Sequence, residues 1–398
     1  MDRRTNPYTP NAGAQPPFLV GRDRELEAFD ILLTRMERGL TQQSMIITGL
    51  RGVGKTVLLG AFREIAEERR WVTLDTEITK NASFANRFAR LTRQGLLRLS
   101  TTERWRDRAR RAASVLKSFS VTFDPQGSVA IGLDVDPLQG QADSGDLSED
   151  LTDLLLALGE AVKESGRGVV FLFDELQYLQ VDELGALITA LHKTVQRGLP
   201  VTFVGAGLPQ IPALAGEAKS YSERLFTFPR IGPLARADAI KALTVPAADL
   251  DVDYDDSAIS CIVDYTEGYP YFLQEYGSVV WDHSDRSPVT EVDARSAQPL
   301  VEEKLDESFF RVRIERATPA ERRYMRAMAE CGPGPQTAGD VAQRLGKTTQ
   351  QMAPARARLI DKGLLYTPSY GYAAFTVPQF DRYLLRSDQP PSSTGDEI

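Results

Sequence analysis

Short apolar segments alternate with amphipathic helical segments through the first two thirds of the chain. Five apolar segments have the length and β-branched content of strands, and they lie at Ser44–Thr48, Trp71–Thr76, Val169–Phe173, Val201–Val204 and Phe226–Ile231. Nearly continuous apolar character is typical of strands that helices cover on both faces of a sheet. The alternation of such strands with helices therefore predicts an α/β fold with a parallel sheet.

One segment interrupts this alternation. Residues Lys117–Val135 alternate apolar and polar positions on both sides of a turn at Asp124–Gly127, which predicts a β-hairpin. A basic helix is predicted before it, over Thr102–Lys117, with five arginines around Trp105. We interpret this helix either as a solvated surface or as a contact with nucleic acid.

The rest of the chain divides by composition and pattern. Residues 1–17 are rich in Pro, Asn and Gly and predict a disordered leader, and residues 388–398 predict a disordered tail. A core is predicted over 18–233, with an insertion at about 77–146, followed by a helical region over 234–317. A further domain over 318–387 opens at Thr318–Glu321, a capping box with proline at the first helical position.

Composition excludes several functional classes. Two cysteines and two histidines among 398 residues make a disulfide framework, a histidine-ligated metal centre or a Ser-His-Asp hydrolase improbable. No apolar run approaches the length of a membrane span and no export signal is visible, so we expect a cytoplasmic protein without a membrane partner. The net charge is −8, but residues 318–387 hold ten basic and five acidic side chains, so one domain is basic.

The strongest motif follows the first predicted strand. It matches G-x-x-x-x-G-K-[ST] in full, and its residues are Gly49, Leu50, Arg51, Gly52, Val53, Gly54, Lys55 and Thr56, with Val57 opening the next helix. Glycines let backbone N–H groups surround phosphates, and the helix N-terminus adds positive potential. The lysine reaches the β- and γ-phosphates and the hydroxyl ligates Mg²⁺, so the motif predicts an ATP·Mg²⁺ site.

A matching acidic motif ends the third predicted strand. The apolar run Gly168–Phe173 leads into Asp174 and Glu175. After a complete phosphate-binding loop, Asp174 is predicted to hold Mg²⁺ and Glu175 to activate the attacking water. Asp174 follows Lys55 by 119 positions, which is a longer separation than the connection between two adjacent strands requires. This length indicates an insertion between the two motifs.

The segment Phe18–Glu25 carries a specific resemblance. Two apolar residues followed by Gly-Arg-x-x-Glu, ahead of the phosphate-binding loop, resemble the adenine-side motif of AAA+ and STAND ATPases. The closest resemblance is to the subgroup that includes archaeal and origin-recognition initiator ATPases, and it extends over about residues 18–387. It implies a P-loop parallel-sheet ATPase core, a helical lid and a C-terminal winged helix-turn-helix domain, with Val20, Gly21 and Arg22 near the base or ribose.

Further residues follow in the order of that family. The strand at Val201–Val204 runs into Gly205-Ala206-Gly207, where relatives carry a polar sensor-1 residue, and this departure puts γ-phosphate sensing in doubt. Ser222–Leu234 resembles the arginine-finger region, which implies Arg224, or else Arg230, as a residue offered to a neighbouring protomer. Glu267–Gln274 resembles the Gly-x-Pro motif of STAND ATPases and implies that Pro270 closes over the nucleotide. A sensor-2 arginine is not evident.

The basic domain resembles a winged helix. Helices are predicted at Thr318–Ala329, Ala338–Leu345 and Pro354–Lys362, with a turn at Thr348–Gln351 and wing strands at Leu364–Thr367 and Ala373–Val377. Arg356, Arg358 and Lys362 on the third helix are the predicted nucleic-acid contacts. Winged helices also bind proteins, so a protein interface is the alternative.

These inferences lead to two functional hypotheses. The first is a slow ATP-binding and ATP-hydrolysing switch whose nucleotide state controls the winged helix on duplex DNA. The second is a STAND-type signalling ATPase in which the winged helix binds a protein partner. Both imply an ATP-dependent homo-oligomer.

Overall fold

The computed structural model describes residues 1–80, 82–99, 107–124 and 135–387. The chain divides into two compact units. We call residues 22–49 and 55–231 the core unit, and residues 1–21, 50–54 and those from 232 onward the second unit. No helix among the described residues is long and apolar enough to cross a membrane.

The core unit is built on a five-stranded parallel sheet. Its strands are β1 (Ser44–Thr48), β2 (Val72–Glu77), β3 (Val169–Asp174), β4 (Val201–Gly207) and β5 (Phe226–Thr227), in the order β2-β3-β4-β1-β5. The predicted parallel sheet is confirmed, with β5 shorter than expected. Pro229 follows β5 and lacks the N–H that a longer ladder needs, so only a bridge between Thr48 and Arg230 continues the pairing.

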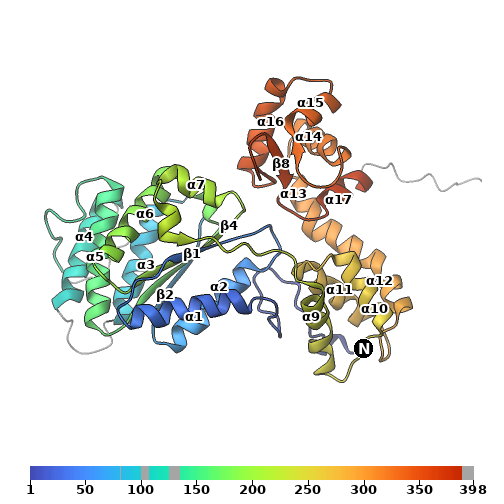
Figure 1. The fold of residues 1–398 in the computed structure, drawn as a ribbon, viewed down its shortest axis with the longest axis horizontal. Helices are drawn as coiled ribbons and strands as arrows, with labels where there is room; N and C mark the ends of the chain where they lie inside the picture. Colours follow the sequence, from blue (N-terminus) through green and yellow to red (C-terminus); the bar gives the residue numbers. More distant parts are fainter. Residues whose placement is uncertain (81, 100–106, 125–134, 388–398) are drawn as a thin grey trace, which may run out of the picture. The chain divides into compact units, whose positions relative to one another are not determined.

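Helices cover both faces of this sheet (Figure 1). Helices α1 and α2 lie together on one face, and α3 to α6 form the layer on the other. The helices and short turns of the core unit are α1 (Asp23–Glu37), α2 (Lys55–Glu68), α3 (Phe84–Leu99), α4 (Asp107–Phe123), α5 (Leu147–Glu164), η2 (Leu176–Tyr178), α6 (Val181–Gln196), α7 (Ile211–Ala218) and α8 (Ser222–Leu225). Phenylalanines fill the interface with α3; Phe88 stacks on Phe171 with ring centroids 4.8 Å apart.

The predicted hairpin at Lys117–Val135 is wrong over its first half. Residues 117–123 continue helix α4, while residues 125–134 lie outside the described chain. Phe119 and Val121 were expected on one face of a strand, yet Phe119 is fully buried and Val121 is 57% exposed. Ala112, Val115, Leu116 and Phe119 recur at helical spacing, so a period of 3.6 describes the segment better than a period of 2.

The second unit contains a bundle of helices joined to a C-terminal module. The bundle consists of α9 (Arg236–Ala248), α10 (Asp256–Thr266), α11 (Pro270–His283) and α12 (Glu291–Lys304), followed by a π-helical segment η3 (Leu305–Arg311) and α13 (Val312–Ile314). Helices make up most of the residues between Arg236 and Ile314.

The N-terminal leader is ordered against this bundle, contrary to the prediction of disorder. It contains a short turn, η1 (Arg3–Thr5), and Tyr8 is only 4% exposed. The Tyr8 hydroxyl donates to the Leu243 carbonyl oxygen at 2.6 Å. Gly277 provides the space, because a Cβ there would lie 2.7 Å from the Tyr8 ring. The polar composition of the leader predicted disorder because it gave no sign that Tyr8 would be buried.

The C-terminal module combines helices with a small antiparallel sheet. Its elements are α14 (Pro319–Glu330), β6 (Gln336–Thr337), α15 (Ala338–Arg344), α16 (Thr349–Asp361), β7 (Leu365–Tyr366), β8 (Tyr372–Phe375) and α17 (Phe380–Ser387), with sheet order β6-β8-β7. The third predicted helix starts at Thr349 rather than Pro354. Thr348 and Gln351 form a capping box, so the segment interpreted as a turn is the start of the helix.

We predict that two helical glycines differ in their tolerance of alanine. Gly159 in α5 faces β4, and an added Cβ would lie 2.9 Å from Leu199 Cδ1 and Val201 Cγ2. Gly216 in α7 has no atom within 4 Å of that position. Gly159→Ala should destabilise the protein by about 1–3 kcal/mol through overpacking, whereas Gly216→Ala should be neutral or stabilising by up to about 1 kcal/mol. Chemical denaturation of the two variants measures this; equal effects would contradict the close approach of α5 to the sheet.

Candidate functional site

The phosphate-binding motif forms the loop between β1 and α2. Gly52 and Gly54 have φ of 81° and 90°, a left-handed conformation that glycine adopts without strain. Helix α2 begins at Lys55, so its first backbone N–H groups face the loop, where they can bind an anion. The Lys55 ammonium is buried and donates to the Gly49 carbonyl oxygen at 3.0 Å. The loop therefore has the backbone geometry that phosphate binding requires.

The motif meets the acidic motif of β3. Thr56 Oγ1 donates to Asp174 Oδ2 at 2.6 Å, although β4 lies between β1 and β3. Burial raises the pKa of Asp174, while hydrogen bonds from Thr56 Oγ1 and from the Glu175 N–H oppose that rise. A hydroxyl and a buried carboxylate at this distance are hard oxygen donors, the kind that Mg²⁺ prefers. Thr56 and Asp174 thus fit a magnesium ion as a pair.

Glu175 stands just beyond the strand in a left-handed conformation, with φ of 57°. This conformation is uncommon for a residue other than glycine and is a form of local strain that often marks functional sites. The Gln177 side-chain amide donates to Glu175 Oε2, and Gln177 Oε1 accepts the Leu208 N–H at 3.2 Å. Gln177 therefore links the Glu175 carboxylate to the end of β4. Sequence analysis missed this residue, whose only signal is its place two positions after Glu175.

The glycines at the predicted sensor-1 position have a packing explanation. A Cβ on Gly205 would lie 2.2 Å from Leu176 Cδ1, and one on Gly207 would lie 3.0 Å from Gln177 Oε1. The turn that holds Glu175 and Gln177 thus passes directly over the end of β4. A larger polar residue at either glycine would displace that turn. The glycines that replace the family's polar residue are therefore required by the packing of this site.

The predicted base-side residues occupy special backbone positions. Gly21 has φ of 69° and Arg22 is the N-cap residue of α1, where its side chain makes no capping bond. A Cβ on Gly21 would lie 3.0 Å from Leu234 Cδ2 and from Asp238 Oδ2. Val20 is half-buried and Arg22 is buried. The segment is therefore a tight, glycine-dependent turn before a helix.

Pro270 is the first residue of α11, the helical position at which proline is favoured. Gly268 before it has φ of 70°, and an added Cβ would lie 2.4 Å from the Leu234 carbonyl oxygen. The residue after Pro270, Tyr271, donates its N–H to the Gly52 carbonyl oxygen at 3.3 Å within the second unit. The Gly-x-Pro motif thus begins a helix whose N-terminus contacts the glycine-rich loop.

The two arginine-finger candidates lie beside the last strand of the sheet. Arg224 belongs to α8 and Arg230 follows β5, and both side chains are exposed. Neither forms an ion pair with a carboxylate among the described residues.

Two family models match separate parts of the chain. Residues 19–204 match the family model described as an AAA ATPase domain. Residues 19–204 form an AAA ATPase domain, so the chain is a P-loop ATPase. A second family model, described as a domain of unknown function (DUF8462), matches residues 307–384, which cover most of the C-terminal module. No curated protein matches the sequence of this ATPase significantly.

Three solved structures are similar to this chain over most of its length. A Walker-type ATPase of Pyrococcus abyssi is similar with a TM-score of 0.56 and 15% identity, covering 93% of this chain and 97% of that chain. The ORC1 protein of Aeropyrum pernix in complex with DNA has a TM-score of 0.46 and 13% identity, covering 94% of each chain. The RuvB Holliday junction branch migration motor of Thermotoga maritima has a TM-score of 0.44 and 15% identity, covering 92% of this chain and 95% of that chain.

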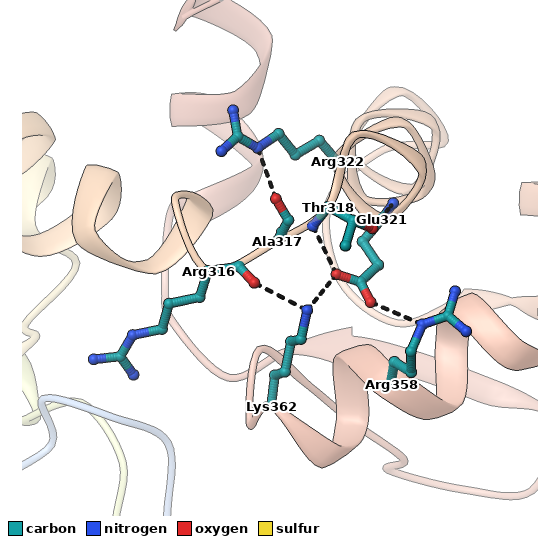
Figure 2. A network of polar contacts seen from close by, with 7 residues as sticks. All are labelled: Arg316, Ala317, Thr318, Glu321, Arg322, Arg358 and Lys362. Atoms are coloured by element: carbon teal, nitrogen blue, oxygen red, sulfur yellow. Dashed lines mark hydrogen bonds and ion pairs between the residues drawn. The ribbon is translucent and has the colours of Figure 1, made fainter.

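The predicted nucleic-acid residues of the ATPase have partners inside the C-terminal module. Glu321 on α14 has a fully buried side chain, and Figure 2 shows Lys362 and Arg358 converging on its carboxylate. Lys362 Nζ lies 2.6 Å from Glu321 Oε2, and Arg358 Nε lies 3.0 Å from Oε1. Lys362 also donates to the Arg316 carbonyl oxygen. These two cations hold α16 against the start of α14.

Arg356 points elsewhere. Its Nη2 donates to the Tyr372 carbonyl oxygen at 2.7 Å, at the beginning of β8. Its Nε is buried and has no partner among the described residues. The structure does not bring the three predicted cations together on one exposed surface, because Arg358 and Lys362 turn toward Glu321 whereas Arg356 turns toward the start of β8.

We predict that Gln177→Leu slows ATP hydrolysis without weakening ATP binding. The leucine fills the same space but no longer orients the Glu175 carboxylate, so a loss of about 10-fold or more in the single-turnover rate is expected, within the range of general-base effects. Fluorescent-nucleotide titration should give an unchanged Kd. Gln180→Leu, at the N-cap of α6, serves as the control, and an equal rate loss there would contradict the positioning role.

The Glu321 cluster predicts a pH-dependent stability. Burial alone would raise the pKa of Glu321, but hydrogen bonds from Lys362, the Thr318 N–H and Arg358 lower it from 4.5 to about 2. A lowered pKa contributes stability above pH 4.5, and that stability is lost as the pH falls toward 2. Wild-type protein should lose unfolding free energy over this window, and Glu321→Gln should be less stable at pH 7 by about 2 kcal/mol because the buried amide loses the charge-assisted hydrogen bonds from Lys362 and Arg358.

The matched control for that experiment is Glu330→Gln on the same helix. Glu330 pairs with Arg326 and Arg344, but its side chain is 31% exposed. Such pairs contribute about 1 kcal/mol or less. Thermal unfolding of both variants between pH 2 and pH 7 measures the difference, and similar losses at pH 7 would show that burial of Glu321 has no special effect.

Proposed function

We propose that this ATPase is a Mg²⁺-dependent molecular switch. The observation that carries the proposal is the contact between Thr56 and Asp174, which joins the phosphate-binding loop to the acidic end of β3. Thr56 and Asp174 would hold the ion, which neutralises charge on the phosphates. Lys55 would leave the Gly49 carbonyl for the β- and γ-phosphates, and Glu175, oriented by Gln177, would accept the proton of the attacking water.

The nucleotide would be held from both sides of the loop. Backbone N–H groups in the stretch from Gly49 to Val57 would bind the phosphates, since the loop is glycine-rich and α2 begins within it. Val20, Gly21 and Arg22 would contact the base or ribose, and Pro270 at the start of α11 would cover the nucleotide. ATP and ADP would shift the second unit only through contacts that differ between the two nucleotide states.

Hydrolysis is proposed to be slow in the isolated protomer. The end of β4 carries glycines that the Gln177 turn requires, so a polar group for the γ-phosphate is missing from that strand. An arginine from a neighbouring protomer would supply the positive charge that stabilises the transition state at the γ-phosphate. Arg224 is the first candidate for this role and Arg230 is the second. An ATP-dependent homo-oligomer follows from this role.

The C-terminal module is proposed to be a winged helix. The chain order α14, β6, α15, α16, β7, β8 and the sheet order β6-β8-β7 support this interpretation. Duplex DNA is the first candidate ligand, with α16 in the major groove. Because Arg358 and Lys362 bind Glu321, contacts would come chiefly from the exposed start of α16, at Lys347, Thr349 and Gln350.

A protein partner is the second candidate, as in a STAND-type signalling ATPase. The same Glu321 cluster favours it, because the cluster consumes two of the cations that would otherwise bind phosphate. Tyr370, fully exposed at the turn between β7 and β8, and the 41% exposed Tyr372 are apolar groups suited to a protein interface.

We predict that a Glu175→Gln variant, which retains ATP, binds duplex DNA more tightly with ATP than with ADP. Fluorescence anisotropy at two salt concentrations measures the affinity and its salt dependence. Lys347→Ala should weaken binding and reduce the magnitude of the salt slope by about one. Arg63→Ala, an exposed cation on α2, is the control. Absence of binding in both nucleotide states would exclude the DNA role while leaving the ATPase assignment intact, and ATP-dependent pull-down would then seek a protein.

A further inference from the structure

The core unit has an open pocket at the edge of its sheet opposite to the phosphate-binding loop. The pocket has a volume of about 1180 Å³ and lies at the amino ends of β2, β3 and β4. Asp174 and Glu175 stand at the carboxyl end of β3, and six strand residues span roughly 20 Å. We call this the basal pocket. It is separate from the nucleotide site.

Cationic side chains dominate the basal pocket. Its lining has five of them, Arg69, Arg70, Arg98, Lys163 and Arg167, and two acidic ones, Glu37 and Glu67. The acidic groups are already engaged. Glu37 pairs with Arg69 and accepts the Trp71 indole N–H, and Glu67 accepts the Thr73 hydroxyl.

The other four cations have no carboxylate partner among the described residues. Arg98 Nη1 donates to the Thr73 carbonyl oxygen at 2.6 Å, and Arg167 Nε donates to the Arg70 carbonyl oxygen at 2.8 Å. These bonds fix each guanidinium through one edge. A guanidinium has five N–H donors, so others on each group remain available. The side chain of Arg70 makes no hydrogen bond or ion pair within the described chain.

The positive charges of Arg98 and Arg167 repel each other when no anion is bound. Arg167 Nη1 also donates to the Arg98 backbone carbonyl oxygen at 3.4 Å, so the Arg167 guanidinium lies beside the end of α3 that carries Arg98. Burial and the neighbouring Arg98 lower the pKa of Arg167. Like charges held together by the backbone, with no carboxylate between them, form a site that a bound anion would relieve.

The competing explanation for the cluster of cations is that the side chains bind backbone carbonyl groups and no ligand. Several helices end at this edge, and cations near helix C-termini are stabilising without any ligand. Bonds to backbone carbonyls account for one N–H of Arg98, two of Arg167, and one of Lys163, which donates to the Gly198 carbonyl oxygen. They leave unexplained the Arg70 side chain and the repulsion between the charges of Arg98 and Arg167.

We propose that the basal pocket is a second anion site, which binds a small polyphosphate through Arg98, Arg167 and Arg70. Guanidinium groups suit this ligand because their planar forks bind phosphoryl oxygens in pairs. The donors converge from three segments into a concave surface, as in small-molecule sites, rather than lying along a convex basic stripe of the kind that follows nucleic acid.

The experiment uses isothermal titration of the full chain with pyrophosphate. Wild-type protein should bind two equivalents, one at the phosphate-binding loop and one in the basal pocket. Lys55→Ala should remove the first and leave one. In that background, Arg98→Gln with Arg167→Gln should weaken the remaining site by about tenfold or more, because charge-assisted hydrogen bonds are lost.

Two further variants keep the result interpretable. Arg63→Gln with Arg90→Gln removes the same charge from exposed positions outside the pocket lining and should leave the affinity unchanged. Arg70→Gln breaks no bond within the described chain, so it tests the site even where the double variant unfolds. Loss of all pyrophosphate binding with Lys55→Ala, equal effects of the two double variants, or binding of short duplex DNA in place of pyrophosphate would each overturn the proposal.

Discussion

The hydrogen bond between Thr56 and Asp174 is the contact on which the catalytic arrangement depends. Asp174 ends β3 and Thr56 lies in the first turn of α2, which follows β1, so the contact joins elements that β4 separates in the sheet. Gly205 and Gly207 lie at the end of β4. The same two glycines make room for the turn that carries Glu175 and Gln177, so one packing constraint explains both the placement of the acidic group and the missing polar sensor.

The parallel sheet separates two chemistries at its two edges. At the carboxyl edge, helix α2 starts at the glycine-rich loop, and its free N–H groups favour an anion. At the amino edge, helices end and cations gather around their carbonyl groups. The first edge has a lysine, a hydroxyl and two carboxylates for a metal–phosphate complex, whereas at the second edge cationic side chains outnumber the carboxylates. The same strand direction produces both, because all five strands point one way.

In the C-terminal module, a buried carboxylate decides what its basic residues can do. Glu321 caps α14 through the Thr318 N–H and at the same time takes Lys362 and Arg358 from α16. A buried carboxylate needs such partners, since leaving it uncompensated would cost several kcal/mol. Two cations that look available for phosphate in the sequence are therefore part of the module's own packing. The net positive charge of this module therefore overstates the number of cations that are available to bind phosphate.

The sequence by itself determined the α/β class, the strands, the phosphate-binding loop and the acidic motif, because each depends on local spacing and short-range backbone demands. It also determined the helix start at Thr318, where the capping box is contained in four residues. Tertiary structure decided the rest. The order of the strands, the Gln177 link, the ordered Tyr8 segment, the helical course of residues 117–123 and the partners of Arg358 and Lys362 all depend on groups far apart in the chain. A sequence pattern shows which side chains are charged or apolar; only the packed chain shows which atoms they meet.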